Sequence, residues 1–242
     1  MPRSVAIFVT CIVDQLFPKA GLAMVDVLER LGFDVEFRSA QTCCAQPAFN
    51  SGYQDEARAV ALHFIDTFAD AETIVVPSGS CTSMITHHYA DLFAGDAKTM
   101  ERVNALTPRV FEFSQFLLGQ PNLDSLAARF PHKVTYHDSC HALRELGLKE
   151  APRRLLGLVK DLELVEMEAA EECCGFGGTF SVKFAQISGA MARTKVDSIL
   201  QTGASHVVSL DSSCLMQLRG SLSRAGHKVE TLHLAEVLAS RG

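Results

Sequence analysis

The stretch Glu171-Glu-Cys-Cys-Gly-Phe-Gly-Gly-Thr-Phe-Ser181 places two adjacent cysteines directly before three glycines in four residues. Glycine adds no apolar side chain and loses the most backbone freedom on folding, so this segment is poor material for a core. Thiolates are soft ligands for iron or zinc, and glycines let backbone N–H groups approach a bound inorganic anion such as sulfide. The stretch therefore predicts a metal-cluster loop, with the alternative that both cysteines are small buried hydrophobic side chains beside a flexible turn. The cofactor-binding residues expected in this loop are Cys173, Cys174, Gly175, Gly177 and Gly178.

A second copy of the cysteine pattern favours the metal-binding interpretation. In the first half, 31 residues (12–42) separate Cys11 from the doublet Cys43-Cys44, and 36 residues (45–80) separate that doublet from Cys81. In the second half the corresponding intervals are 32 residues (141–172) after Cys140 and 39 residues (175–213) before Cys214. This agreement at a period of about 130 residues indicates an internal duplication. Cysteines that only filled a core would have no reason to keep such a register.

Short β-branched runs alternate with amphipathic segments in both halves. Strands are expected at 3–11, 34–38, 73–77, 133–140, 164–167 and 206–210, and helices at 20–31, 55–69, 83–92, 153–162 and 185–202. Strands that alternate with helices predict parallel sheets with right-handed crossovers. The fold class expected is α/β, with two tandem Rossmann-like three-layer lobes and mainly parallel sheets. We place the first domain at 1–120, a linker at 121–132 and the second domain at 133–242.

The predicted strands end at the cysteines. In parallel α/β sheets ligands gather beyond the carboxyl ends of the strands, because those ends lie along one edge. Cysteines far apart in the sequence are therefore expected to meet at that edge, four in each half. The eight expected metal ligands are Cys11, Cys43, Cys44, Cys81, Cys140, Cys173, Cys174 and Cys214.

Composition narrows the classes of function. The formal net charge is −6 and the pI is about 5.8, which gives no basic surface for nucleic acid or an anionic membrane. No apolar run approaches the roughly 18 residues of a membrane-spanning helix, and no secretory signal is recognised at the start. A cytoplasmic location is the expectation. A reducing cytosol keeps thiols free, so eight cysteines there indicate metal binding or thiol chemistry instead of a disulfide framework.

Three chemistries remain open on spacing alone. Four thiolates per half match a [4Fe-4S] cluster, with up to two in the chain, and they also match a tetrahedral zinc site. The short C-x2-C-x2-C run of bacterial ferredoxins and the C-x2–4-C knuckles of zinc ribbons are both absent. A thiol–disulfide oxidoreductase that uses Cys173-Cys174 as a vicinal pair is the third interpretation. His137 and His141 flank the end of a predicted strand, where they either assist Cys140 or face solvent.

The residues around each cysteine resemble a known family. The doubled pattern is similar to the cysteine-rich CCG domains of heterodisulfide reductase and of the iron–sulfur subunit of glycolate oxidase. More narrowly, four segments resemble the lactate-utilisation protein A family: Pro77-Ser-Gly-Ser-Cys-Thr-Ser-Met84, Tyr136-His-Asp-Ser-Cys-His-Ala-Leu-Arg-Glu-Leu146, Glu172-Cys-Cys-Gly-Phe-Gly-Gly-Thr-Phe-Ser-Val-Lys183 and Ser213-Cys-Leu-Met-Gln217.

That resemblance implies an iron–sulfur electron-transfer subunit in a system that oxidises L-lactate to pyruvate. It implies two partner subunits, at least one of them an iron–sulfur protein. The chain offers no flavin or nicotinamide motif, so it is expected to be a redox subunit and not a complete enzyme.

The sequence departs from the longer family pattern in two places. That pattern closes each half with C-x-x-C, whereas the last position here is Met84 or Gln217, so a set of five cysteine ligands is not available. Ala45 follows the first doublet where Gly175 follows the second. Zinc in the first half, as a zinc-stabilised scaffold, stays open as an alternative.

Overall fold

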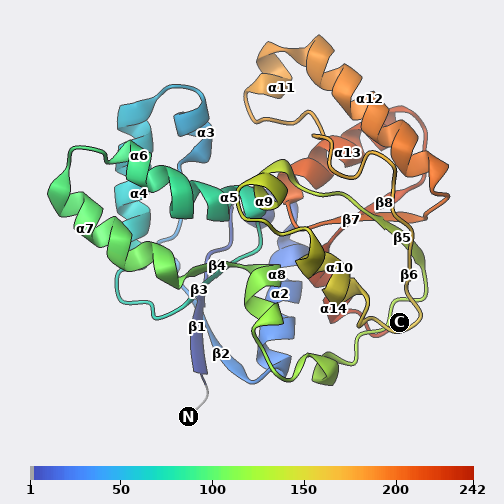
Figure 1. Cartoon of the computed structure of the whole chain (residues 1–242), viewed down its shortest axis with the longest axis horizontal. Coiled ribbons are helices and arrows are strands. Elements are labelled where there is room, and N and C mark those ends of the chain that lie inside the picture. Colours follow the sequence, from blue (N-terminus) through green and yellow to red (C-terminus); the bar gives the residue numbers. More distant parts are fainter. Residues whose placement is uncertain (1–2) are drawn as a thin grey trace.

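The computed structural model describes residues 3–242, which form two four-stranded sheets (Figure 1). The first sheet has the order β2-β1-β3-β4 and the second has the order β6-β5-β7-β8. Every named pair of neighbours in both sheets is parallel. The strands are β1 (Arg3–Ile7), β2 (Phe33–Phe37), β3 (Ile74–Val76), β4 (Val110–Glu112), β5 (Lys133–Tyr136), β6 (Glu163–Leu164), β7 (His206–Ser209) and β8 (Glu230–His233). The α/β class and the tandem Rossmann-like arrangement are confirmed.

Helices cross over between successive strands. Those of the first half are α1 (Cys11–Leu16), α2 (Pro18–Arg30), α3 (Gln46–Asn50), α4 (Gln54–Thr67), α5 (Gly79–Ser83), α6 (Tyr89–Leu92), α7 (Ala97–Leu106) and α8 (Phe113–Leu118). Those of the second half are α9 (Cys140–Arg144), α10 (Glu150–Leu156), α11 (Phe180–Lys183), α12 (Ala185–Gln201), α13 (Ser212–Arg224) and α14 (Leu234–Ala239). A π-helical turn, Met84–His88, joins α5 to α6.

Helix α2 shows how local sequence sets these elements. Pro18 occupies the first helical turn, where its missing N–H costs nothing. Met24, Val27 and Leu28 lie at helical spacing and are fully buried. Gly32 follows the helix with φ +84°, a left-handed conformation that glycine adopts without strain.

The two halves pack against each other through equivalent helices. Helix α2 contacts α14, and α8 contacts α10. By position between strands, α2 corresponds to α10 and α8 corresponds to α14. The two contacts are therefore the same contact made twice, as in an interface with two-fold symmetry. Figure 1 shows these four helices between the two sheets, with α4, α6 and α7 on the outer side of the first half and α12 and α13 on the outer side of the second.

One hydrophobic core runs across this interface. Val5, Ile7 and Leu28 from the first half belong to the same buried cluster as Tyr136 and Leu234 from the second. The segment 121–132 contributes to it as well, through Leu126 and Ala128, and contains a 3₁₀ turn at Leu123–Leu126. The division at 121–132 stays a proposal about the duplication, because the halves share buried surface across it.

Element boundaries differ from the expectation mainly at the site. The strands expected at 3–11 and 133–140 end at Ile7 and Tyr136, because Cys11 and Cys140 begin helices α1 and α9. Helix α13 was not expected from the sequence, although it carries Cys214. No helix within residues 3–242 has the length and apolar character needed to cross a bilayer.

Candidate metal centre

Each half presents its cysteines at the carboxyl edge of its sheet. Cys11 and Cys140 are the first residues of α1 and α9, which follow β1 and β5. The doublets lie in the loops after β2 and β6. Cys81 and Cys214 occupy the first turns of α5 and α13 after the third strand of each half. Neighbouring strand ends therefore bring residues about 70 positions apart to one place, as the sequence pattern predicted.

All eight cysteines line a single cavity of about 120 Å³. The sequence analysis placed one thiol set on each lobe and did not predict that the two sets face the same space. Within each set two thiols are buried and two are partly exposed. The buried thiols are Cys44, Cys81, Cys174 and Cys214, and the partly exposed thiols are Cys11, Cys43, Cys140 and Cys173.

Within each set, one thiol of the doublet accepts hydrogen bonds from two others. Hydrogen bonds from Cys11, whose Sγ lies 3.9 Å from that of Cys43, and from Cys44 lower the pKa of Cys43 to about 3. Hydrogen bonds from Cys140 and Cys174 lower the pKa of Cys173 to about 2 in the same way. The pKa of each donor is raised, because deprotonation would break its hydrogen bond and add charge in a partly desolvated place. Among these hydrogen-bonded thiols, the first cysteine of each doublet is therefore the one that ionises most readily.

These contacts fit a soft metal centre. Four thiolates in mutual contact repel one another, and a bound cation removes that repulsion while it deprotonates the ligands. Two cysteines on one tetrahedral zinc ion, at about 2.3 Å each, lie about 3.8 Å apart. The 3.9 Å between the sulfurs of Cys11 and Cys43 matches that spacing. A cluster with one cysteine per iron atom needs the thiols to spread farther.

The backbone after each doublet has the same left-handed conformation. Gly175 has φ +83° and Ala45 has φ +74°. A Cβ atom on Gly175 would lie 2.7 Å from the carbonyl oxygen of Ser188, so this position excludes any larger residue. The first half therefore has the backbone of the glycine position but carries an alanine there, at a cost in strain of about 1 kcal/mol.

The three glycines of the second loop adopt left-handed conformations. Gly177 and Gly178 have φ +53° and +63° and line the cavity. The N–H of Gly175 donates to Sγ of Cys173 at 3.4 Å. This hydrogen bond is the kind of backbone contact to sulfur that the glycines were expected to allow. A cofactor-binding role for the glycines stays a prediction.

Helix α12 anchors the loop that carries Cys173-Cys174. The Nζ of Lys195, on a fully buried side chain, donates to the carbonyl oxygens of Ala169 and Ala170. Ser198 Oγ accepts from the N–H of Ala169 at 3.0 Å, and Ser188 Oγ donates to the carbonyl of Gly175 at 2.7 Å. A loop without regular secondary structure is thereby fixed to a 17-residue helix.

Asp211 joins the two halves beside the cavity. Its side chain is buried and caps α13, accepting from the N–H of Ser213 at 3.2 Å. The other carboxylate oxygen accepts from the N–H of Ser80 in the first half at 2.9 Å. Ser78 and Ser139 also donate to this oxygen, each at 3.4 Å. One carboxylate therefore holds the strand ends of both halves together.

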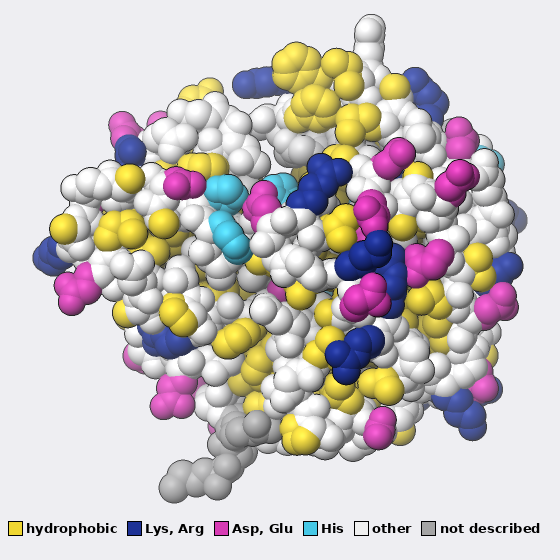
Figure 2. All heavy atoms as spheres, viewed as in Figure 1, with side chains coloured by type: hydrophobic (Ala, Val, Ile, Leu, Met, Phe, Trp, Pro, Cys, Tyr) yellow, Lys and Arg dark blue, Asp and Glu magenta, His cyan; other side chains and the backbone are white. Residues whose placement is uncertain are grey.

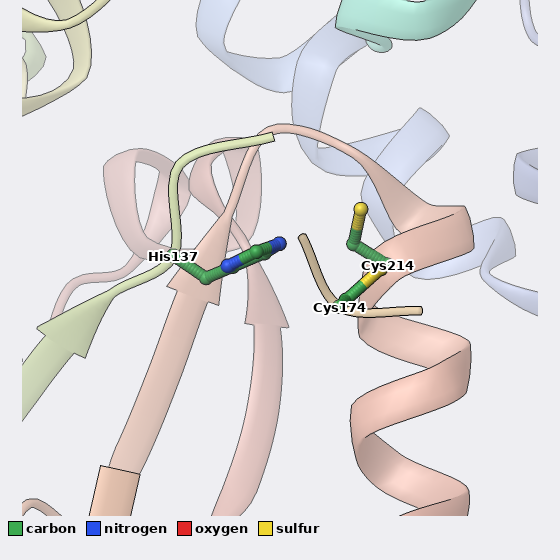
Figure 3. A group of neighbouring side chains, drawn as sticks. All are labelled: His137, Cys174 and Cys214. Carbon is green, nitrogen blue, oxygen red and sulfur yellow. The ribbon is translucent and has the colours of Figure 1, made fainter. Parts of the chain in front are cut away.

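His137 and His141 lie in different surroundings, a difference that the sequence did not reveal. His141 is half-buried, with Nδ1 3.5 Å from the sulfur of Cys140 and Nε2 3.4 Å from Nε2 of Gln46. His137 is fully buried and lies beside Cys174 and Cys214, where its ligand atom and their sulfurs all lie within 4.8 Å of one another (Figure 3). Burial lowers the pKa of His137 to about 3, so the imidazole is neutral. Superposing the two cysteine registers could have singled it out, since Phe8 holds the same place in the first half.

Comparisons with known proteins find relatives for both halves of the chain. The profile of the cysteine-rich domain family CCG matches residues 5–86 and 134–219. Lactate utilization protein A of Exiguobacterium sp. is 49% identical over 98% of this chain and 97% of its own length. Lactate utilization protein A 2 of Bacillus mycoides is 46% identical over 98% of this chain and 99% of its own.

Among solved structures, a putative Asp/Glu racemase from Yersinia pestis is 11% identical over 98% of this chain and 96% of that one, with a TM-score of 0.38, a likeness too slight to carry any conclusion. The two matched domains and the near full-length relatives show that the chain belongs to the cysteine-rich CCG domain family, together with the lactate utilization A proteins.

Proposed function

We propose that this chain is an iron–sulfur electron-transfer subunit of a multi-protein system that oxidises L-lactate to pyruvate. The observation that carries the proposal is the convergence of four thiols in each half on one cavity. The names of the relatives support the lactate part of the proposal. A cytoplasmic location is part of it, because free thiols persist there.

The residues of the chain would bind, shield and tune the metal. When bound, iron–sulfur clusters accept and release single electrons at potentials set by their ligands, hydrogen bonds and exposure. Cys43, Cys44 and Cys173 are among the thiolates that would hold them. The hydrogen bond from Gly175 to the sulfur of Cys173 reduces the charge on that ligand. Lactate gives up two electrons and two protons on becoming pyruvate, so a partner subunit must accept that pair before single electrons reach this chain.

An exposed apolar surface beside the second thiol set supports docking of such a partner. Val182 on α11, Phe184 between α11 and α12, and Ile187 on α12 are 80%, 53% and 56% exposed. Figure 2 shows a hydrophobic patch at the upper edge of the molecule, over these two helices. Helices α11 and α12 directly follow the glycine loop after Cys173-Cys174. A contiguous patch of large exposed apolar side chains often marks an interaction site, whereas single exposed apolar residues are common on any protein surface. Two partner subunits, at least one of them an iron–sulfur protein, complete the proposal.

Anaerobic reconstitution tests the metal assignment. Protein loaded with iron and sulfide under argon is analysed for both elements and by EPR before and after reduction. We expect two clusters per chain in the wild type and about half the iron and sulfide in either Cys44→Ser or Cys174→Ser. These two substitutions are matched controls, because each changes the buried doublet cysteine of one half. Protein that binds zinc and never iron, or iron content that neither substitution reduces, would refute the proposal.

Zinc in the first half is the second candidate, favoured by the 3.9 Å spacing of the Cys11 and Cys43 sulfurs. A structural zinc site contributes directly to folding. Cys44→Ser would then destabilise the whole fold when the protein is prepared with zinc, since the two halves share one core, whereas loss of a redox cluster would leave the fold in place. Circular dichroism and zinc analysis of this variant distinguish the two.

The low pKa of Cys173 also favours thiol–disulfide exchange by the doublet Cys173-Cys174. In that case metal-free protein reacts rapidly with an alkylating reagent at Cys173, and Cys174→Ser abolishes disulfide turnover without changing the metal content. Mass spectrometry of the alkylated peptide gives the result.

A further inference from the structure

We propose that His137 is a ligand of the metal centre in the second half, together with Cys174 and Cys214. Phe8 takes the place of His137 in the first half, so the two centres have different ligand sets. This inference rests on the metal binding proposed above.

The position of His137 fits a ligand. Its side chain has no exposed surface, and within the described residues neither ring nitrogen has a hydrogen-bond partner. One ring nitrogen and the sulfurs of Cys174 and Cys214 are all within 4.8 Å of one another. Figure 3 shows the imidazole reaching from the end of β5 toward the two thiols, one of them on the first turn of α13.

Burial without partners is expensive for an imidazole and needs an explanation. A neutral ring carries one N–H donor and one lone pair, and polar groups buried in proteins are almost always paired. A nitrogen lone pair next to two buried thiols is the natural donor for zinc or iron, both of which accept imidazole with thiolate. Metal coordination would give the lone pair of His137 the partner that it lacks among the described residues.

The first half shows what the same position looks like without such a role. Phe8 follows β1 as His137 follows β5, and each lies three residues before the first cysteine of its half. Phe8 is also fully buried, but its ring packs on Phe64 and Phe68 with centroids 4.8 and 5.8 Å apart. The fold therefore accepts an apolar ring at this position. Packing alone does not require a histidine in the second half, so we explain it by metal binding.

His141 is the obvious competitor and serves as the control. It is the other histidine beside the second thiol set, with Nδ1 3.5 Å from the sulfur of Cys140. It differs in being half-exposed and in having Gln46 as a partner. A nitrogen signal that survives His141→Phe can be assigned to His137.

Pulsed EPR with isotope labelling tests the proposal. The full-length protein is produced with natural-abundance or ¹⁵N-labelled histidine, loaded anaerobically with iron and sulfide, and compared with His137→Phe and His141→Phe. Where zinc is bound instead, cobalt(II) is placed in the same site, so the ligand can be tested even if the iron–sulfur proposal fails. We expect a histidine nitrogen coupling in the wild type that remains in His141→Phe and disappears in His137→Phe. Metal affinity of the second site should fall at least about tenfold in His137→Phe.

A second readout separates a ligand from a packing residue. His137→Cys supplies another soft donor with a negative charge, so it should restore metal content and lower the reduction potential of the second centre relative to wild type. Wild-type protein that binds metal without any histidine nitrogen coupling would overturn the inference and leave the proposed function intact. So would a coupling lost in His141→Phe or retained in His137→Phe. Protein that binds no metal of any kind overturns both. If His137→Phe does not fold, the wild type and His141→Phe alone decide.

Discussion

At the scale of single residues, the position after each cysteine doublet has the same backbone conformation in both halves but is occupied by different residues. Gly175 and Ala45 both have positive φ, but only glycine adopts that conformation freely. The alanine strain and the tight contact of Gly175 with Ser188 make these two positions respond to substitution in opposite directions.

We expect Gly175→Ala to destabilise the metal-free protein by about 2–4 kcal/mol, since it adds left-handed strain and a clash with backbone. Ala45→Gly should stabilise it by up to about 1 kcal/mol, because removal of strain exceeds the added freedom of the unfolded chain. Urea denaturation of both variants measures the free energies of unfolding. A stabilised Gly175→Ala variant would contradict the conformation described for the second doublet.

Glu112 gives a pH dependence that can be assigned to one side chain. It is fully buried at the end of β4, and burial raises its pKa to about 7 from 4.5. Between these values the folded state keeps a proton that the unfolded state has lost. Its contribution to stability is therefore full below pH 4.5, falls as the pH rises, and is lost above 7.

Glu112→Gln cannot titrate, so its free energy of unfolding should gain about 3 kcal/mol relative to wild type between pH 4 and 8. Buried histidines with lowered pKa values, such as His137 and His233, act with the opposite sign. They are present in both proteins and cancel in the difference. A difference that is flat with pH would show that Glu112 is ionised in the folded state.

Single residues also mark the limit of what the sequence could reveal. The eight cysteines were predicted as ligands because their spacing alone carries the signal. His137 was not, because an imidazole near a strand end has the same sequence signature whether it faces solvent or metal. Only its burial and its missing partners distinguish the two.

At the scale of elements, the alternation of strands and helices was readable because apolar runs and turn residues have local signatures. The starts of α1, α9 and α13 could not be predicted. Each of these helices begins in a segment that the sequence pattern assigned to the end of a strand or to a polar turn with a cysteine. The Cys173-Cys174 loop has no periodic pattern of apolar residues. Its conformation is fixed by hydrogen bonds between its backbone and the side chains of Lys195, Ser188 and Ser198 on α12. Tertiary contacts of that kind leave no trace in a local pattern.

The exposed face of α11 and α12 is expected to bind a partner. Phe184→Asp should leave the stability within about 0.5 kcal/mol, as exposed substitutions usually do, and weaken association with the partner proteins at least about tenfold. Leu22→Asp on α2 is a suitable control, because Leu22 is 70% exposed and belongs to another helix. Sedimentation of the reconstituted assembly compares them. Equal weakening by both substitutions would place the docking surface elsewhere.

At the scale of the whole molecule, the sequence predicted a duplication but not how the copies pack. Repeat spacing shows that two similar units exist, whereas their docking depends on which helix faces are left uncovered. Here α2 meets α14 and α8 meets α10, so the halves share one core and their carboxyl edges meet.

The shared core predicts that neither half folds alone. A fragment of residues 1–132 would expose its side of the shared core, because α2 packs against α14 of the second half. We expect it to lack a cooperative thermal transition and to bind a hydrophobic dye. Addition of the fragment 133–242 should restore the transition. A sharp transition in 1–132 alone would show that the two halves are independent domains.

The common cavity has a consequence for the order in which electrons would be taken up. Under the proposed function, a charge placed on one centre would act on the other, because both sets of ligands line the same 120 Å³ cavity and charges interact strongly at short range. The first reduction therefore makes the second harder, and a redox titration should show two separate waves. Emptying the first centre with Cys44→Ser should move the wave of the second centre to higher potential, since the neighbouring negative charge is gone. Under the proposed function, the two halves, which match the same domain family, would thus release two electrons at two different potentials.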